Sequence, residues 1–215
     1  IAEALEELHA DRLEEFAPLL AHHFYSAGDE RSLKYDVMAG EKAALLYANA
    51  EAAAHFRRGL EVARRNGGDL RQIRHLFLEL GRVLELAGRY EQALENYDAW
   101  QAFGREHGDR SIEMNALMAK APLYSIFTPL HNSSLSEQLL LEALEISQEI
   151  GDRAAQARLS WNLMLNYLFS KRLDLALEHG QRALNLARQS EDREQLAYVL
   201  NDLCRLYTCR GEFEK

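Results

Sequence analysis

Apolar residues recur along most of the chain at intervals of three and four positions, which places them on one face of a helix. One such stripe consists of Leu76, Leu80, Val83, Leu84 and Ala87. No alternating or β-branched stretch competes with this pattern, so we predict an all-α protein. The predicted helices are two N-terminal helices near 1–9 and 11–27, helix pairs at 29–47 and 49–66, 69–87 and 89–107, 109–127 and 132–150, and 152–170 and 172–190, and a final helix at 192–210.

The boundaries between the helix pairs carry a repeated Gly-Asp pair. It begins at Gly28, Gly68, Gly108 and Gly151, and Glu191-Asp192 continues the series, at intervals of 40, 40, 43 and 40 residues. Glycine adopts the left-handed conformation that closes one helix, and aspartate then accepts hydrogen bonds from the first free N–H groups of the next helix. The pattern therefore predicts a unit of two helices that repeats about every 40 residues.

One helix pair alone cannot bury its apolar face, whereas stacked pairs bury a continuous core. We therefore predict a right-handed superhelix of stacked antiparallel helix pairs over residues 29–215, with helices at 1–28 that cap the array or link it to an upstream domain. The sequence stops in the turn of the fifth repeat, so we expect a longer parent protein. We also expect Leu203, Leu206 and Tyr207 to lack the cover that the next helix would provide.

Residues at fixed positions recur in three of the units. They are Phe77, Leu80, Gly81, Leu84, Gly88, Tyr90, Ala93 and Tyr97 in the unit that begins at Gly68, then Leu163, Tyr167, Leu173, Ala176, Ala183 and Leu184, and finally Leu203, Tyr207, Gly211 and Phe213. These positions resemble the tetratricopeptide repeat (TPR) pattern. The chain departs from it in its longer period, in Trp100 at a position that usually holds alanine, and in Met164 and Cys204, which replace a glycine. The resemblance implies a TPR-like α-solenoid.

A narrower resemblance covers residues 1–65. It is carried by Leu20-Ala21-His22-His23-Phe24, Ala39-Gly40-Glu41-Lys42-Ala43 and Tyr47-Ala48-Asn49-Ala50-Glu51-Ala52. These runs resemble the segment after the nucleotide-binding module of large bacterial signalling ATPases of the STAND type, some of which are linked to adenylate cyclase or DNA-binding domains. The resemblance implies the repeat-rich portion of such a transcriptional regulator. The chain itself has no phosphate-binding loop, because Gly40-Glu41-Lys42 lacks the earlier glycine and the following hydroxyl residue.

Composition narrows the class of protein further. Hydrophobic residues make up 47% of the chain, and the net charge of −9 comes from interspersed charges of both signs. This balance argues against direct nucleic-acid binding, which usually needs a basic face. No apolar run approaches the roughly 20 residues of a membrane span, so we expect a cytoplasmic protein. Cys204 and Cys209 point about 140° apart on one helix, and we expect reduced, partly buried thiols.

Catalytic and metal-binding motifs are not recognisable in the sequence. His22 and His23 point about 100° apart on their helix, so they do not readily chelate one ion, and we expect one to be packed and one exposed. Acidic pairs such as Glu6-Glu7 are explained more simply as solvated helix faces. We therefore expect no enzymatic activity, no metal and no cofactor.

In TPR-like arrays the first helix of each pair lines an inner, concave face. The inward positions here are His75, Leu78, Arg82, Glu85, Asn115, Met118, Pro122, Ser125, Arg158, Trp161, Leu165, Leu168, Tyr198, Asn201, Arg205 and Thr208. Arginines bind carboxylates and aromatic residues supply rigid apolar area, which suits a binding wall; the alternative is a surface that is merely solvated. We expect Pro122 to bend its helix and widen the groove, and Trp100 to lie in the core.

These features lead to two main hypotheses for function. The first is a non-catalytic interaction scaffold whose concave face binds a peptide or a protein domain, including another domain of the parent chain. Its predicted contact residues are His75, Arg82, Met118, Arg158, Trp161, Tyr198, Asn201 and Arg205. The second is a domain that senses a small-molecule inducer. A third hypothesis is self-association through the C-terminal edge.

Overall fold

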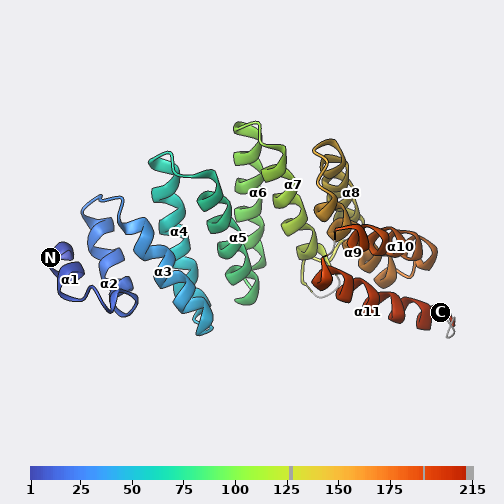
Figure 1. The fold of residues 1–215 in the computed structure, drawn as a ribbon, viewed down its shortest axis with the longest axis horizontal. Helices are drawn as coiled ribbons and strands as arrows, with labels where there is room; N and C mark the ends of the chain where they lie inside the picture. The colour runs from blue at the N-terminus through green and yellow to red at the C-terminus, as the bar shows by residue number, and fades with distance from the viewer. Residues whose placement is uncertain (126–127, 191, 212–215) are drawn as a thin grey trace. The chain divides into compact units, whose positions relative to one another are not determined.

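The computed structural model describes residues 1–125, 128–190 and 192–211, and all regular secondary structure in these ranges is helical (Figure 1). The predicted all-α repeat fold is confirmed, and most predicted boundaries lie within three residues of the observed ones. The helices are α1 (Ala2–Leu8), α2 (Leu13–Ser26), α3 (Ser32–Leu45), α4 (Asn49–Arg65), α5 (Leu70–Leu86), α6 (Tyr90–Glu106), α7 (Arg110–Lys120), the 3-10 turn η1 (Ala121–Tyr124), α8 (Ser133–Glu149), α9 (Arg153–Phe169), α10 (Leu173–Gln189) and α11 (Arg193–Arg210).

The chain forms two compact units, Ile1–Tyr97 and Asp98–Lys215, called unit 1 and unit 2 below. The division falls within α6 and does not coincide with the predicted border at residue 28. The division into helices at 1–28 and a repeat array over 29–215 therefore stays a prediction, as does the right-handed sense of the stack.

Unit 1 is built from consecutive helices that pack side by side, α2 on α3, α3 on α4 and α4 on α5. Small residues allow the close approach of paired helices. A methyl group added to Gly40 would overlap the Phe56 ring, and one added to Gly81 would overlap the Tyr97 ring. In the same pair, Asn96 of α6 donates a hydrogen bond to the Phe77 carbonyl of α5 at 2.8 Å. Glycine and aromatic positions of the repeat pattern therefore pack against each other.

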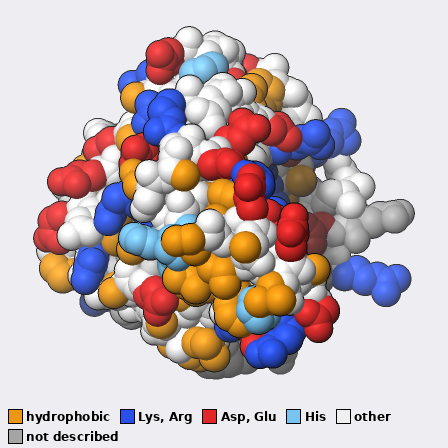
Figure 2. All heavy atoms as spheres, turned by 90° about the vertical axis from the view of Figure 1, so that its left-hand side faces the viewer, with side chains coloured by type: hydrophobic (Ala, Val, Ile, Leu, Met, Phe, Trp, Pro, Cys, Tyr) orange, Lys and Arg blue, Asp and Glu red, His pale blue; other side chains and the backbone are white. Residues whose placement is uncertain are grey.

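The end of unit 1 that carries α1 and α2 presents a mixed surface (Figure 2). Acidic and basic side chains are interspersed there around a small apolar patch. The exposed apolar residues of these helices include Leu8 and Leu19. Of the described helices, none is long and apolar enough to cross a membrane.

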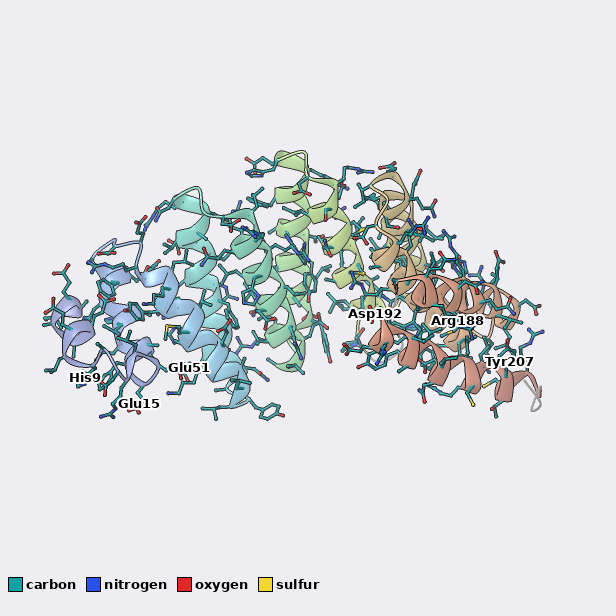
Figure 3. All side chains as sticks on the ribbon, viewed as in Figure 1. His9, Glu15, Glu51, Arg188, Asp192 and Tyr207 are labelled. Carbon is teal, nitrogen blue, oxygen red and sulfur yellow. The ribbon has the colours of Figure 1, made fainter. Side chains whose placement is uncertain are left out.

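Unit 2 has its own hydrophobic core, to which α7, α8, α9, α10 and α11 contribute. In it α9 packs against α8, α10 and α11, so that first helices of successive repeats touch. Leu159 and Leu163 of α9 are fully buried, and Val199 of α11 is equally buried. The helix α11 starts next to Asp192 and carries Tyr207 near its other end (Figure 3).

The Gly-Asp boundaries act largely as predicted. Gly28, Gly108 and Gly151 have φ values of 70°, 63° and 73°, in the left-handed region that favours glycine. The side chains of Asp69, Asp109, Asp152 and Asp192 each accept a hydrogen bond from an N–H in the first turn of the helix that follows. At the second boundary, the left-handed residue is Gly67 at φ 64° in place of Gly68. Glu191 lies outside the described residues.

Pro122 ends its α-helix, whereas we expected it to bend a helix reaching residue 127. Helix α7 stops at Lys120, and the residues from Ala121 to Tyr124 form a 3-10 turn with proline near its start. Proline has no N–H to donate and its ring clashes with the carbonyl four residues earlier, so it disfavours continuation of an α-helix through its position. Residues 126–127 of the predicted helix lie outside the described part of the chain. The shorter α7 leaves space beside α9.

Two expectations for α11 were wrong. Leu203 and Leu206 do not lack cover, because α9 and α10 of the preceding repeat bury them. Tyr207 is half-buried. Cys204 and Cys209 are exposed thiols, since the buried face of α11 runs through Leu203 and Leu206 and turns these two positions outward. No disulfide joins the two cysteines.

Candidate functional site

The residues predicted to line the inner face are divided between the two units. His75 and Arg82 lie on α5 in unit 1. The His75 Nε2 atom is 3.2 Å from the Glu41 carboxylate, and Arg82 is exposed. The structure does not bring these two residues together with another predicted residue in unit 1.

Three predicted residues of unit 2 converge on Asp202, and a fourth, Tyr198, stacks on one of them. The Trp161 indole N–H of α9 donates to Asp202 Oδ2 of α11 at 2.9 Å, and Arg205 pairs with Asp202 Oδ1 at 3.2 Å. Asn201 is 3.5 Å from the same oxygen. The Trp161 and Tyr198 rings stack with centroids 5.7 Å apart. Together they form what we call the Asp202 cluster: Trp161, Tyr198, Asn201, Asp202 and Arg205.

The Asp202 carboxylate holds this cluster in one geometry. Its side chain is only 10% exposed, and hydrogen bonds from Trp161 and Arg205 reach both of its oxygens. A buried carboxylate is stable only with such partners, because its desolvation is otherwise unfavourable. The aromatic pair and Arg205, which stays 55% exposed, are therefore preorganised.

The remaining predicted residues have different surroundings. Arg158 is exposed on α9, and no ion pair joins it to a described residue. Met118 is half-buried and packs against the core of unit 2, so little of it faces solvent. Leu168 and Asn115, also expected to face inward, are buried. Trp100 is 1% exposed and lies in the core, as predicted.

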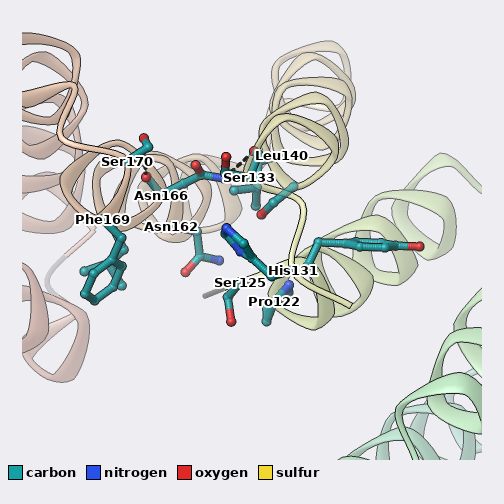
Figure 4. Close-up of a pocket in the computed structure, with 12 residues that line it drawn as sticks. Pro122, Ser125, His131, Ser133, Leu140, Asn162, Asn166, Phe169 and Ser170 are labelled. Carbon is teal, nitrogen blue, oxygen red and sulfur yellow. Dashed lines mark hydrogen bonds between the residues drawn. The ribbon is translucent and has the colours of Figure 1, made fainter. Parts of the chain in front are cut away.

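A pocket of about 260 Å³ lies in unit 2 beside the end of α7 (Figure 4). Its walls come from the η1 turn and the segment after it, from α8 and from α9. Pro122, Ser125 and Leu165, all predicted to face inward, line it. The full lining is Pro122, Tyr124, Ser125, His131, Ser133, Ser136, Leu140, Asn162, Leu165, Asn166, Phe169 and Ser170.

Hydrogen bonds fix part of this lining. Asn166 donates to the Ser133 carbonyl at 3.1 Å, and Ser170 donates to the Asn166 carbonyl at 2.8 Å. In Figure 4, Asn162 extends from α9 toward the middle of the pocket, across from His131 and Ser125. No hydrogen bond joins the Asn162 carboxamide to any of the described residues, so it can bind a ligand. Apolar walls are formed by Pro122, Leu140, Leu165 and Phe169.

An ion-pair network supports the helices around the pocket. The Tyr167 hydroxyl donates to Glu137 at 2.8 Å, and Arg172 pairs with the same carboxylate at 2.5 Å. Burial and the hydrogen bond to Glu137 raise the pKa of Tyr167 to about 12, so the hydroxyl keeps its proton. Burial lowers the pKa of His179, whose ring lies 5.4 Å from that of Tyr167.

The pocket and the Asp202 cluster share one face of α9. Trp161, Leu165 and Phe169 follow one another at intervals of four residues, which aligns them on a helix. Phe169 lines the pocket and also lies under Arg205, whose guanidinium carbon is 5.9 Å from the ring centroid. Phe169 thus contacts both the pocket and the cluster, and this side of α9 is called the α9 face below.

Sequence reasoning missed Asp202, Asn162, Asn166 and Phe169 as functional residues. Asp202 stands four residues after Tyr198, at the helical spacing that brings side chains together, and this signal was available in the sequence. In the described ranges, no three His, Cys, Asp or Glu side chains gather as metal ligands would.

Comparisons with known proteins identify the fold. BtubC (BKLC) from P. vanneervenii superposes with a TM-score of 0.72 at 21% identity, covering 95% of this chain and 83% of that one. The apo form of RapI gives a TM-score of 0.71 at 16% identity, covering 93% of this chain and 69% of that one. No protein-family model and no curated protein matches the sequence. The chain has a TPR-like helical repeat fold.

Proposed function

We propose that the chain is a non-catalytic binding module whose α9 face takes up an extended peptide segment with an acidic group. The observation that carries this proposal is the Asp202 cluster, in which a fixed Trp161–Tyr198 pair and Arg205 lie on the same face as a pocket. Rigid aromatic residues and arginines dominate the energetics of protein interfaces.

The charges of the face favour an acidic ligand. Arg205 pairs with Asp202 at 3.2 Å, and this ion pair offsets the negative charge of the carboxylate. Arg158 adds an exposed cation one helical turn before Trp161. A carboxylate on the bound segment gains charge-assisted hydrogen bonds from such arginines.

The resemblance of residues 1–65 to the segment after the ATPase module of STAND-type regulators supports a proposal for the biological setting. We propose that this repeat domain is the regulatory scaffold of such a multidomain, cytoplasmic signalling protein. On this proposal the bound segment belongs to another protein or to another domain of the same parent, and its binding controls the output.

A peptide-display selection tests the proposed function. Peptides selected on the protein should be enriched in acidic and aromatic residues. Trp161→Ala should weaken their binding by at least about 30-fold, as expected for an interface anchor. Arg158→Glu should weaken it about tenfold by charge reversal. Arg182→Glu, an exposed arginine of α10 away from this face, is the matched control and should bind normally.

Isothermal titration calorimetry gives the affinities of all variants, because Trp161→Ala leaves only the buried Trp100 and therefore has no tryptophan near the site to report binding by emission. Selected peptides that bind equally well to Trp161→Ala and Arg158→Glu would remove the α9 face from consideration.

The pocket specifically favours a second candidate function, the sensing of a small-molecule inducer. A concave site with a few unpaired polar groups and apolar walls is typical of small-molecule binding. In this case the inducer acts on the same face as the peptide.

A further inference from the structure

The pocket in unit 2 is lined mainly by apolar surface with a few polar groups, and it carries no acidic, lysine or arginine side chain among its twelve lining residues. Charged residues make up 27% of the chain, so a set of twelve drawn at random would contain about three. Amides, hydroxyls and one imidazole supply the polar groups. The lining therefore offers a ligand hydrogen-bonding groups without a charged side chain.

An ionised ligand group would be poorly stabilised in such a pocket. Moving a charge out of water is unfavourable unless a counter-charge or several hydrogen bonds replace the lost hydration. Arg205, whose guanidinium carbon lies 5.9 Å from the Phe169 ring centroid, is already paired with Asp202, and Arg172, two residues after Ser170, is paired with Glu137. A neutral polar group has no such penalty.

The hydrogen-bonding groups of the pocket that remain free define which ligand group fits it. The Asn162 carboxamide offers one acceptor and two donor hydrogens side by side, and none of them is used by another described residue. Asn166 uses its NH₂ group on Ser133 and keeps its side-chain oxygen as an acceptor. A ligand carboxamide is the complement of this arrangement, because it pairs with Asn162 through two parallel hydrogen bonds.

The apolar walls of the pocket indicate what carries the polar group of the ligand. Pro122, Leu140 and Phe169 leave room for a flat apolar body attached to the polar group (Figure 4). Aromatic rings pack favourably against such walls, and Phe169 can contact a ligand ring by stacking or by its edge.

We propose that this pocket is a recognition site for an uncharged carboxamide carried on a small apolar or aromatic body. The site extends the proposed function, since it lies on the α9 face, but it does not depend on the peptide. The carboxamide belongs either to a free small molecule or to an asparagine or glutamine side chain of the bound segment. Both sources present the same chemistry to Asn162.

Three probes of nearly identical size and shape test the charge selectivity: neutral benzamide, anionic benzoate and cationic benzamidine. Binding is measured at pH 8, where histidine side chains are ordinarily neutral, by NMR of the asparagine side-chain NH₂ groups in the whole chain. Benzamide should bind in the millimolar range typical of so small a ligand and shift the Asn162 and Asn166 signals. Benzoate and benzamidine should bind at least about tenfold more weakly.

Substitution of the asparagine tests the hydrogen-bonding role. Asn162→Leu keeps the side-chain volume and should weaken benzamide binding about tenfold. Asn185→Leu, at an exposed site in the middle of α10, is the matched control and should bind benzamide normally. Equal binding of all three probes, or shifts confined to residues outside the pocket, would overturn the proposal. The wild-type NMR result stands even if Asn162→Leu fails to fold.

A competition experiment between benzamide and a selected peptide identifies the source of the carboxamide. If benzamide displaces a selected peptide that contains asparagine or glutamine, the peptide side chain occupies the pocket. If both bind together, a free small molecule is the ligand. Peptide binding that Trp161→Ala leaves unchanged, with benzamide still preferred over the charged probes, would contradict the proposed function alone. Weakened peptide binding in Trp161→Ala, with equal binding of the three probes, would overturn the pocket proposal alone.

Discussion

Helices α5 and α9 hold the same place in two repeats, yet only α9 takes part in the candidate site. Both have 17 residues, and their positions correspond at an offset of 83. Leu76 and Leu80 of α5 match Leu159 and Leu163 of α9, and all four are buried. These shared positions build the repeat, whereas the differences lie on the other face.

On that other face, the residues of α5 and α9 differ. Leu78 of α5 is 41% exposed, and the corresponding residue of α9 is Trp161, held by Asp202. Glu79 corresponds to Asn162, which lines the pocket. A few residue differences on the same helical framework therefore distinguish the solvated face of α5 from the candidate binding face of α9.

The largest expected effect concerns how each helix pair is packed. In the repeat of α5 a small residue, Gly81, faces a large one, Tyr97, and in the repeat of α9 the sizes are reversed, with Met164 facing Gly180. Gly81→Ala forces a methyl group into a rigid buried ring and should cost about 3 kcal/mol of unfolding free energy. Gly180→Ala meets the ends of the Leu203 and Met164 side chains, which shift more readily than a ring, and should cost about 1 kcal/mol. Urea denaturation followed by circular dichroism measures both.

A double substitution provides the control for this packing argument. Gly81→Met combined with Tyr97→Gly imitates the other repeat and should be more stable than Gly81→Met alone. Strictly additive losses would show that the two residues do not form a size-matched pair.

The next largest effect is expected from removal of the buried Asp202 carboxylate. Asp202→Leu leaves the Trp161 N–H without its acceptor and should cost about 2 kcal/mol. The Trp161 emission should also shift to the red as the ring loses its fixed place. Glu79 of α5 holds the same repeat position as Asn162 of α9 and, 40 residues later, Asp202 of α11. Glu79→Leu should change stability by less than about 0.5 kcal/mol. Equal effects at the two positions would contradict the special role of Asp202.

The helix caps should behave alike in the two repeats. Asp152 accepts the Ala155 N–H at 2.9 Å, and Asp69 accepts the Arg71 N–H at 3.0 Å. Replacing either aspartate by alanine should cost about 1 kcal/mol in thermal or urea unfolding, and replacement by asparagine should cost much less. A large difference between the two caps would mean that the Gly-Asp boundaries are not equivalent.

The smallest expected effect is a pH dependence from His179, which corresponds to Asn96 in the other repeat. Burial lowers the pKa of His179 below that of a solvated histidine, so the unfolded chain binds a proton first as the pH falls. Its contribution to stability is present above about pH 6.5 and is lost as the pH falls through that value toward the folded pKa. His179→Asn should remove this part of the pH dependence in unfolding measured between pH 5 and pH 8, and an unchanged profile would contradict it.

The repeat was predictable because its determinants are local. Glycine at a helix end and aspartate at the next start act through neighbouring backbone groups, so the helix boundaries follow from the sequence alone. Trp161, Tyr198 and Arg205 were predicted by their positions in the repeat. Asp202 and Asn162 were not, because their importance comes from contacts across α9 and α11 and from the space that Pro122 leaves at the end of α7.

The hydrogen bond between Trp161 and Asp202 joins side chains that belong to two consecutive repeats. A repeat array evolves readily by duplication or deletion of whole units. Insertion of one unit between these two would separate the indole from its carboxylate without a single point mutation. On the proposed function, ligand recognition is thus tied to the order of the repeats, and a gene rearrangement can create or abolish it in one step.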